Sequence, residues 1–364
     1  MSHAADTSAD QTVDTQLAHT MSAMGVQAKA AARTLALAGT QVKNTVLQSA
    51  ADAMRAAAAD IIAANQRDLT EAEKQNVGAA RLDRIMLDDV RLENIACAVE
   101  AIIALDDPVG ATLAHWQVPS GLDITRVRVP LGVIGVIYES RPNVTADAAA
   151  LCLKAGNAVV LRGSSEIVHS AKAIHACFAG ALEKAGLDPH SVQLVPSTDR
   201  AAVGMMLAGL DGHVDVIVPR GGKNLVSRVQ TEARVPVFAH LEGICHVYVH
   251  GDAELDMARE IVANAKMRRT GICGAAETLL VDAACASSHL AAIVRDLLDA
   301  GCEVRGDAET CATDARVIAA EDSEWGCEFL GPIIAARVVH GLDDAMAHIA
   351  TCGSNHTDAI ITND

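Results

Sequence analysis

The sequence is poor in aromatic residues, which make up 2% of the chain, and it has no excess of basic residues. Its formal charge is -17, from 46 acidic and 29 basic side chains. A nucleic-acid-binding surface needs a basic face and stacking rings, so this composition argues against one. The chain also lacks any run of about 18 uncharged apolar residues, and its start, MSHAADTSADQTVD, is polar and acidic. We therefore expect neither a membrane-spanning helix nor a secretory signal.

The ten cysteines include no CxxC pair. Without a secretory signal, this pattern favours free thiols in a reducing compartment, so we expect a cytoplasmic protein. Cys245 and His246 are adjacent and point to opposite sides of a predicted strand. They cannot both bind one ion without a bulge, and we expect no metal site.

One cysteine lies in a setting that favours reactivity. Cys273 is in the basic, glycine-flanked segment RRTGICG, directly before the apolar strand TLLV. Neighbouring cations and partial exposure favour the thiolate, which is the form that attacks. By contrast, Cys152 and Cys177 lie in Ala- and Leu-rich runs that predict buried helix faces. The sequence favours Cys273 as a nucleophile, with a small buried hydrophobe as the alternative.

The first part of the chain is predicted to be helical. Ala, Leu and Ile recur at spacings of three and four from residue 22 to 105, and Asp106-Asp107-Pro108 ends this region. Residues 1–21 are expected to be a disordered lead. The alternation ITRVRV then predicts a half-exposed strand in a ribbon over 108–130. Such a ribbon is marginal alone, so we interpret it as an oligomerisation arm; an ordinary surface hairpin is the alternative.

From Gly132 apolar strands alternate with capped helices, which predicts a parallel sheet covered on both faces. Ligands of such sheets bind at the carboxyl ends of strands, against helix N-termini. No GxGxxG occurs, so the glycine signal alone is weak. The strand ends with suitable residues are Arg141-Pro142-Asn143, Arg162-Gly163-Ser164-Ser165 and Pro219-Arg220-Gly221-Gly222, and the strands include GVIGVIY, AVVLRG, SVQLV, VDVIV and VPVFAHL.

A second, smaller region of alternating predicted helices and strands begins near Gly251. A chain of 364 residues with 51% apolar residues is long enough for two domains. The expected fold class is α/β, with a parallel-sheet, Rossmann-like cofactor domain and a smaller α/β catalytic domain. We assign 22–107 and 131–245 to the first, 108–130 to the arm and 246–364 to the second. A crevice between domains, a common location for pockets, would bring Cys273 to the cofactor.

The segment from Tyr138 to Glu166, YESRPNVTADAAALCLKAGNAVVLRGSSE, resembles the signature of the gamma-glutamyl phosphate reductases, a family of the aldehyde dehydrogenase superfamily. Further motifs agree in order: VPRGGKNLV, HLEGICHVYV, ICGAAETLLV, EFLGP and CGSNHTDAIIT. An ordered set of motifs is far more specific than any one of them. The resemblance runs from about residue 22 to the end, and it implies an aldehyde dehydrogenase-like fold.

The resemblance also implies a reaction. Cys273 would attack the acyl carbon of L-glutamyl 5-phosphate, expel phosphate and form a thioacyl enzyme. NADPH would then deliver hydride, giving L-glutamate 5-semialdehyde, in the second step of proline biosynthesis from glutamate. Asn143 matches the asparagine whose amide helps to form the oxyanion hole. From the residues alone, Asn143 is equally a candidate helix N-cap.

The resemblance places the cofactor residues at Arg162, Ser164, Ser165, Arg220, Gly221, Gly222 and Glu328. A strand-end arginine with hydroxyls suits a 2′-phosphate, which favours NADP over NAD. Helix capping is the alternative for the serines, a turn for the glycines and a solvated charge for Glu328.

His240 matches the position of the general-base glutamate of hydrolytic aldehyde dehydrogenases. Without that base, water is poorly activated against the thioester, as an enzyme that uses acyl phosphate requires. Glu242 is close in sequence and is either a substitute base or a loop carboxylate.

Substrate recognition is less determined. Ser354, His356, Thr357 and Asp358 match a family segment at the substrate end, and Arg141, Arg268 and Arg269 are the nearest cations for phosphate or carboxylate. Thr270 and Gly274 depart from the proline and asparagine that many relatives carry beside the nucleophile.

Family members continue past TDAIIT, so we interpret the chain as truncated at its C-terminal end, with an exposed strand edge. The family implies a homodimer or higher homo-oligomer and functional coupling to glutamate 5-kinase. Two alternatives to the reductase are an aldehyde dehydrogenase for another acid and a catalytically silent scaffold or regulatory domain. Phosphate-dependent NADP reduction with glutamate semialdehyde separates the first of these from the reductase.

Overall fold

The computed structural model describes residues 4–364, and the chain divides into two compact units, Met1–Ala239 and His240–Asp364. We expected the second domain to begin at residue 246. The boundary lies earlier because the amides of Gly243 and Ile244 donate to Glu328 and Ser354, which belong to the second unit. Residues 1–3 of the expected disordered lead lie outside the described residues.

The first unit opens with five helices among the described residues, so the helical character predicted for residues 22–105 is confirmed, although turns divide the region. The helices are α1 (Ala4–Leu35), α2 (Thr40–Ala56), α3 (Ala58–Lys74), α4 (Ala79–Ile85) and α5 (Asp89–Ile103). Helix α1 begins well before residue 22, where the sequence placed the first ordered residue. The expectation was wrong for this segment because Leu17 and Met21 already continue the buried stripe of Met24 and Ala28. None of the described helices is long and apolar enough to cross a membrane.

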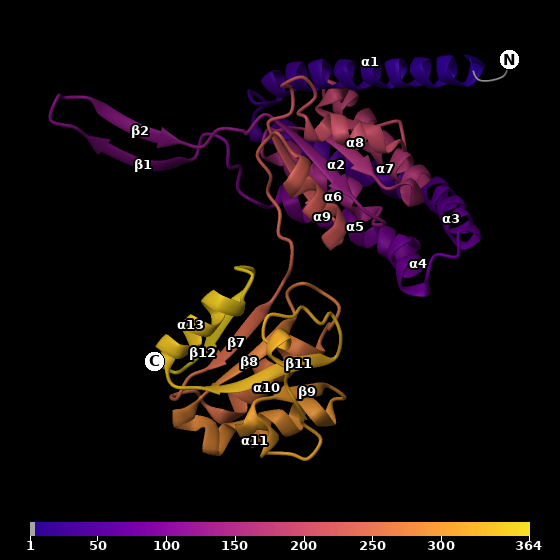
Figure 1. The fold of residues 1–364 in the computed structure, drawn as a ribbon. Helices are drawn as coiled ribbons and strands as arrows, with labels where there is room; N and C mark the ends of the chain where they lie inside the picture. Colours follow the sequence, from indigo (N-terminus) through magenta and orange to yellow (C-terminus); the bar gives the residue numbers. More distant parts are fainter. Residues whose placement is uncertain (1–3) are drawn as a thin grey trace. The chain divides into compact units, whose positions relative to one another are not determined.

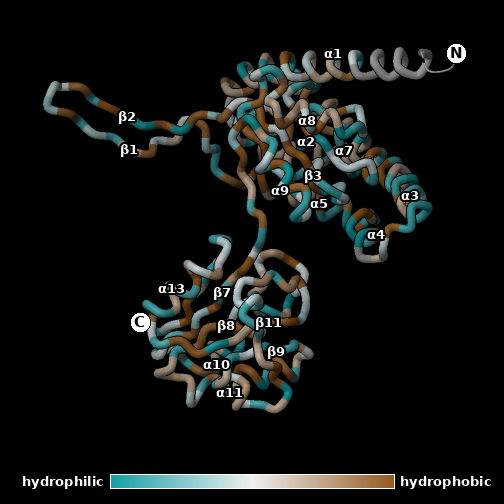
Figure 2. Tube along the Cα trace, in the orientation of Figure 1, coloured by the Kyte–Doolittle hydropathy of each residue, from teal (hydrophilic) through white to brown (hydrophobic). Residues whose placement is uncertain are grey.

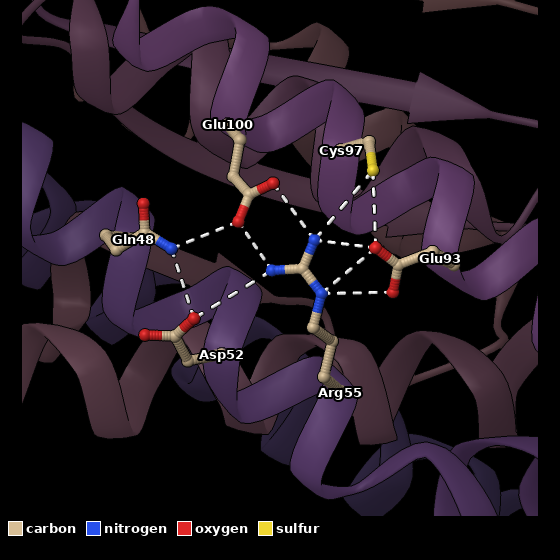
Figure 3. A network of polar contacts seen from close by, with 6 residues as sticks. All are labelled: Gln48, Asp52, Arg55, Glu93, Cys97 and Glu100. Atoms are coloured by element: carbon tan, nitrogen blue, oxygen red, sulfur yellow. Dashed lines mark hydrogen bonds and ion pairs between the residues drawn. The ribbon is translucent and has the colours of Figure 1, made fainter.

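A charged network joins α2 to α5 (Figure 3). The guanidinium of Arg55 donates to the carboxylates of Glu93, at 2.7 Å, and Glu100, at 2.9 Å. Gln48 adds a bond of 3.1 Å to Glu100. The bonds from Arg55 and Gln48 lower the pKa of Glu100 to about 2.

The expected ribbon is an antiparallel hairpin of β1 (Thr112–Gln117) and β2 (Asp123–Val127). It extends away from the rest of its unit (Figure 1). Every residue of β1 is exposed, and Trp116 and Leu122 expose 43% and 63% of their surface. Large apolar side chains on a thin ribbon leave apolar surface in contact with water.

The core of the first unit is a parallel sheet in the order β5-β4-β3-β6. Val136 and Leu161 pack on one face, and Ile137 and Val160 on the other, so the predicted double covering is confirmed. The strands are β3 (Val133–Tyr138), β4 (Ala158–Gly163), β5 (Val192–Leu194) and β6 (Val216–Arg220); the helices are α6 (Asn143–Lys154), α7 (Val168–Lys184), α8 (Arg200–Leu207) and α9 (Lys223–Glu232), with short 3-10 turns η1 (Ser165–Ile167) and η2 (Pro189–Ser191).

The segment VPVFAHL is not the regular strand that the sequence predicted. It makes a single parallel bridge, Val237 with Ile217. Ile217 donates to Pro236 and accepts from Phe238, at 2.9 and 3.0 Å. Because proline has no N–H to donate, the pairing does not extend.

The second unit is a six-stranded parallel sheet in the order β10-β9-β11-β8-β7-β12. Its central strands are strongly hydrophobic (Figure 2). The sequence analysis missed Glu303–Gly306 and Ile318–Ala319, and the second of these has only two residues, too few to show a period. The strands are β7 (Cys245–Val249), β8 (Ala276–Asp282), β9 (Glu303–Gly306), β10 (Ile318–Ala319), β11 (Ile333–Val339) and β12 (Asp358–Ile361); the helices are α10 (Leu255–Met267), α11 (Ala283–Asp299), α12 (Ala308–Cys311) and α13 (Leu342–Cys352), with the turn η3 (Asp322–Glu324).

Candidate active site

Cys273 lies on the loop between α10 and β8, and its side chain is partly exposed. A buried ion pair brackets this loop. Lys266 in the last turn of α10 contacts Glu277 of β8 at 2.6 Å, and both side chains are 0% exposed. The second oxygen of Glu277 accepts from the backbone N–H of Leu330 at 3.3 Å. Burial raises the pKa of Glu277, while the ammonium of Lys266 opposes this shift.

The backbone of Cys273 packs tightly against the segment that leads into β7. A Cβ atom on Gly243 would lie 2.0 Å from the carbonyl oxygen of Cys273, so only glycine fits. The thiol of Cys245 donates to the same oxygen at 3.1 Å. The N–H of Gly243 donates to Glu328 at 2.9 Å. These contacts fix the main chain at Cys273 and connect it to Glu328.

Two histidines approach the Cys273 thiol. His240, Cys273 and His356 each offer one nitrogen or sulfur atom, and these atoms all lie within 4.8 Å of one another. The two rings meet edge to face, with centroids 4.8 Å apart. The sequence analysis named both histidines for other reasons and missed the cluster. No local pattern reveals it, since the residues are far apart in the chain.

Ser354 and Asp358 of the predicted substrate segment contact β7 and the residue before it. Ser354 Oγ accepts from the backbone N–H of Ile244 at 2.9 Å. Asp358 contacts Nδ1 of His246 at 2.9 Å, and the His246 side chain is fully buried. Burial lowers the pKa of His246, and the carboxylate opposes this. Arg268 and Arg269 are exposed on the Cys273 loop, where an anion can reach them.

In the first unit, Asn143 begins α6, and Pro142 is the capping residue. The amide of Asn143 donates to Asp147 at 2.8 Å, so the side chain does not cap the helix. Burial raises the pKa of Asp147, while Asn143 and the charge of Arg220 lower it. Arg141 lies half-buried at the same end of the sheet.

The end of β4 carries a buried cation. Arg162 is 9% exposed, and its guanidinium donates to the carbonyls of Gly163 and Thr198 at 2.9 and 2.8 Å. Its Nε is buried and has no partner among the described residues. Burial lowers the pKa of Arg162. Ser164 Oγ accepts from the N–H of Ser140 and makes no capping bond to the turn that Ser165 begins, so the capping alternative does not hold for Ser164.

The end of β6 and the start of α9 hold a carboxylate. The N–H of Gly222 donates to Glu139 at 2.9 Å. A Cβ atom on Gly221 would lie 2.7 Å from the same carboxyl group. Arg220, beside it, is exposed. The sequence analysis missed Glu139, because only the fold shows that the end of β3 lies next to the end of β6.

The ends of β4 and β6 both present N–H groups that suit anions. A buried guanidinium has an unused N–H, and a glycine-flanked helix start already binds one anionic group.

A family model described as the aldehyde dehydrogenase family matches residues 6–311. The chain belongs to the aldehyde dehydrogenase family. It is 60% identical over 342 residues to the gamma-glutamyl phosphate reductase of Parvibaculum lavamentivorans, covering 94% of this chain and 81% of that protein. It is 62% identical over 344 residues to the reductase of the same name from a Methylobacterium species, covering 94% and 80%.

A solved structure agrees with these similarities. The gamma-glutamyl phosphate reductase of Thermotoga maritima matches with a TM-score of 0.89 and 37% identity, over 94% of this chain and 83% of that one. The expected resemblance and the α/β aldehyde dehydrogenase fold are therefore confirmed. The chain is an oxidoreductase of this family.

Proposed function

We propose that this chain reduces L-glutamyl 5-phosphate to L-glutamate 5-semialdehyde and phosphate, with Cys273 as the nucleophile. Membership among the gamma-glutamyl phosphate reductases makes it a glutamate-5-semialdehyde dehydrogenase of proline biosynthesis. The observation that carries the assignment of the nucleophile is the environment of Cys273. Its thiol is partly exposed on a loop whose backbone is fixed from behind, whereas Cys152 and Cys177 are buried.

The side chain of Cys273 forms the covalent intermediate. Its thiolate attacks the γ-acyl carbon, the carbonyl becomes an oxyanion, and phosphate leaves with the bonding electron pair to give a thioester. We assign Asn143 as the amide donor to that oxyanion, a role supported by its freedom from capping. A bound reduced nicotinamide supplies the hydride for the reduction of the thioester. The resulting hemithioacetal releases the semialdehyde and returns a proton to the sulfur.

His240 takes the position of the general-base glutamate of hydrolytic relatives. We propose that the thioester persists long enough for reduction because no carboxylate base occupies this position. Glu242, two residues on, is half-buried, and we interpret it as a loop carboxylate. Measuring the lifetime of the thioester without cofactor, in the native chain and in Glu242→Gln, tests this; a longer lifetime in the variant would contradict it.

We propose NADP as the preferred cofactor. Support comes from Arg162, whose buried guanidinium has an unused N–H, and from the hydroxyls of Ser164 and Ser165 beside it. Gly221 and Gly222 would hold a phosphate at the start of α9. Arg220 adds an exposed cation there, and Glu328 is proposed to bond the nicotinamide ribose through the oxygen that does not accept from Gly243.

For the substrate we propose Arg268 and Arg269 as the anion-binding groups, because both are exposed on the nucleophile's own loop. Arg141 and His356 remain further candidates. Asp358 and Ser354 are weaker candidates, since each is engaged with the strand β7. We also propose that the hairpin over 108–130 mediates a homo-oligomer, which its exposed apolar side chains support, and that glutamate 5-kinase supplies the acyl phosphate.

Trapping the intermediate tests this function. L-Glutamyl 5-phosphate is generated in the tube by glutamate 5-kinase, NADPH is omitted, and the digested protein is analysed by mass spectrometry. A glutamyl adduct is expected on the peptide that contains Cys273, and it should be absent from Cys273→Ser. Cys327→Ser is the matched control, since Cys327 is also partly exposed in the second unit. An adduct on another cysteine, or turnover retained by Cys273→Ser, would overturn the mechanism.

A further inference from the structure

The cluster of His240, Cys273 and His356 has the chemistry of a metal site. His240 precedes β7, Cys273 lies on the loop before β8, and His356 lies between α13 and β12. Their ligand atoms lie within 4.8 Å of one another. Two imidazoles and a thiolate are ligands that suit Zn²⁺, a borderline-soft ion.

The spacing is compatible with tetrahedral zinc after small side-chain movements. Zinc–sulfur and zinc–nitrogen bonds of about 2.3 and 2.0 Å place ligand atoms roughly 3.3 to 3.7 Å apart. The observed limit of 4.8 Å exceeds this by about an ångström, which side-chain rotation of an exposed His240 can close.

The surroundings hold the less mobile ligands in place. His356 Nδ1 lies 2.9 Å from Thr357 Oγ1, and such outer hydrogen bonds orient imidazole ligands. The main chain of Cys273 is fixed by Gly243. Cys245 Sγ lies 3.6 Å from His356 Nδ1, but burial raises the pKa of Cys245 to about 11, and its thiol donates to the Cys273 carbonyl. The protein therefore offers three ligands, and water completes the tetrahedron.

We propose that His240, Cys273 and His356 bind one Zn²⁺ ion, with water as the fourth ligand. The ion takes the place of the thiol proton, which passes to solvent, and a zinc–sulfur bond forms without any change of oxidation state. Because the same sulfur must attack the acyl phosphate, bound zinc and acyl transfer exclude each other. The site is thus a reversible block on the nucleophile, which also shields it from alkylating agents.

Direct binding tests the site without an activity assay. Zn²⁺ is titrated into the metal-free full chain against a chromophoric zinc indicator. The native protein should take up one tightly bound equivalent. His240→Gln and His356→Gln should each weaken binding by at least ~10-fold, the effect expected even for a residue that only supports a ligand. His340→Gln is the matched control, since His340 is exposed in the same unit, away from the cluster, and it should bind as the native chain does.

Cobalt identifies the ligands. Co²⁺ bound at this site should show thiolate-to-metal charge-transfer absorption, and Cys273→Ser should abolish it, whereas Cys327→Ser should not. In the native chain, Zn²⁺ should slow iodoacetamide labelling of the peptide with Cys273 and leave that of Cys327 unchanged, and a chelator should restore it. Labelling needs no variant, so it reads the site even if a substitution disturbs folding. Unchanged affinity in the doubly substituted histidine variant, or no zinc protection of Cys273, would overturn the proposal.

Discussion

The buried pair of Lys266 and Glu277 should be the point of the second unit at which a substitution costs the most stability. Both side chains are 0% exposed and only 2.6 Å apart, so neither charge is screened by water. Removing one partner of a buried pair leaves an uncompensated buried charge, which costs about 3–5 kcal/mol. Replacing both partners with apolar side chains of similar volume is often neutral. We therefore expect Lys266→Met and Glu277→Leu each to destabilise strongly, and the double variant to recover most of the loss.

Urea unfolding followed by fluorescence measures this. The chain has two tryptophans, Trp116 on the exposed hairpin and Trp325 in the second unit. In a Trp116→Phe background, the emission of Trp325 reports the unit that contains the pair. A loss of unfolding free energy of less than about 1 kcal/mol in either single variant, the range of exposed pairs, would contradict this expectation. Simple addition of the two single losses of unfolding free energy in the double variant would contradict it as well, since residues in contact are coupled.

Catalysis should respond to the same pair. Glu277 also accepts from the N–H of Leu330, two residues after Glu328. Loss of its carboxylate should loosen the Cys273 loop and the segment with Glu328 together. We expect kcat to fall in Glu277→Gln at temperatures where the variant remains folded, and alkylation of Cys273 to change in rate. An unchanged alkylation rate would show that the pair acts on stability alone.

Three further outcomes follow from the structure. Gly243→Ala places a Cβ atom 2.0 Å from the nucleophile's carbonyl oxygen and should sharply lower kcat, whereas Gly274→Ala on the same loop meets no described atom within 4 Å; equal activities in a steady-state assay would contradict this. Asn143→Ala should lower kcat by roughly 100 to 1000-fold with NADPH binding by fluorescence nearly unchanged, and unchanged turnover would refute the oxyanion role. Glu100 has a pKa lowered to about 2, so its bonds stabilise the fold above the ordinary carboxyl range and lose this effect as pH falls toward 2. Arg55→Met should remove that contribution and raise the pH midpoint of acid unfolding by circular dichroism; an unmoved midpoint would argue against it.

The sequence predicted those helices and strands that are long enough to show a clear hydrophobic pattern. Helix α7 has 17 residues and repeats its apolar spacing several times, and strand β8 is a continuous run of seven buried residues. Strand β10 has two residues and is defined only by its pairing with β9, so no local signal exists. The segment around Pro236 is a case in which the sequence predicted a strand that does not form. Its apolar residues suggested a strand, but proline has no N–H to donate, so only one bridge forms. Tertiary pairing decides both cases.

The candidate site shows the same difference between residues with a local sequence signal and residues that only the fold brings together. Cys273 could be proposed from the sequence because the features that favour a reactive thiol, neighbouring cations and partial exposure, belong to its own loop; its role as the nucleophile stays a prediction. The contact of Asp358 could not be predicted from the sequence, because only the fold shows that its carboxylate contacts the buried ring of His246. The cluster of His240, Cys273 and His356 is likewise a product of three separate loops, and Glu139 reaches Gly222 only because β3 and β6 are neighbours.

The Cys273 loop combines a fixed inner side with an open outer side. Its carbonyl is held by Gly243 and Cys245, and Glu277 anchors the start of β8. A side chain at Gly274, by contrast, would meet no described atom within 4 Å. The contacts that position the sulfur are therefore mainly backbone contacts. This explains how the loop can carry a glycine there, in place of the asparagine expected from many relatives, without losing the support of its nucleophile. A larger residue at 274 should alter the fit of the substrate more than the position of the sulfur.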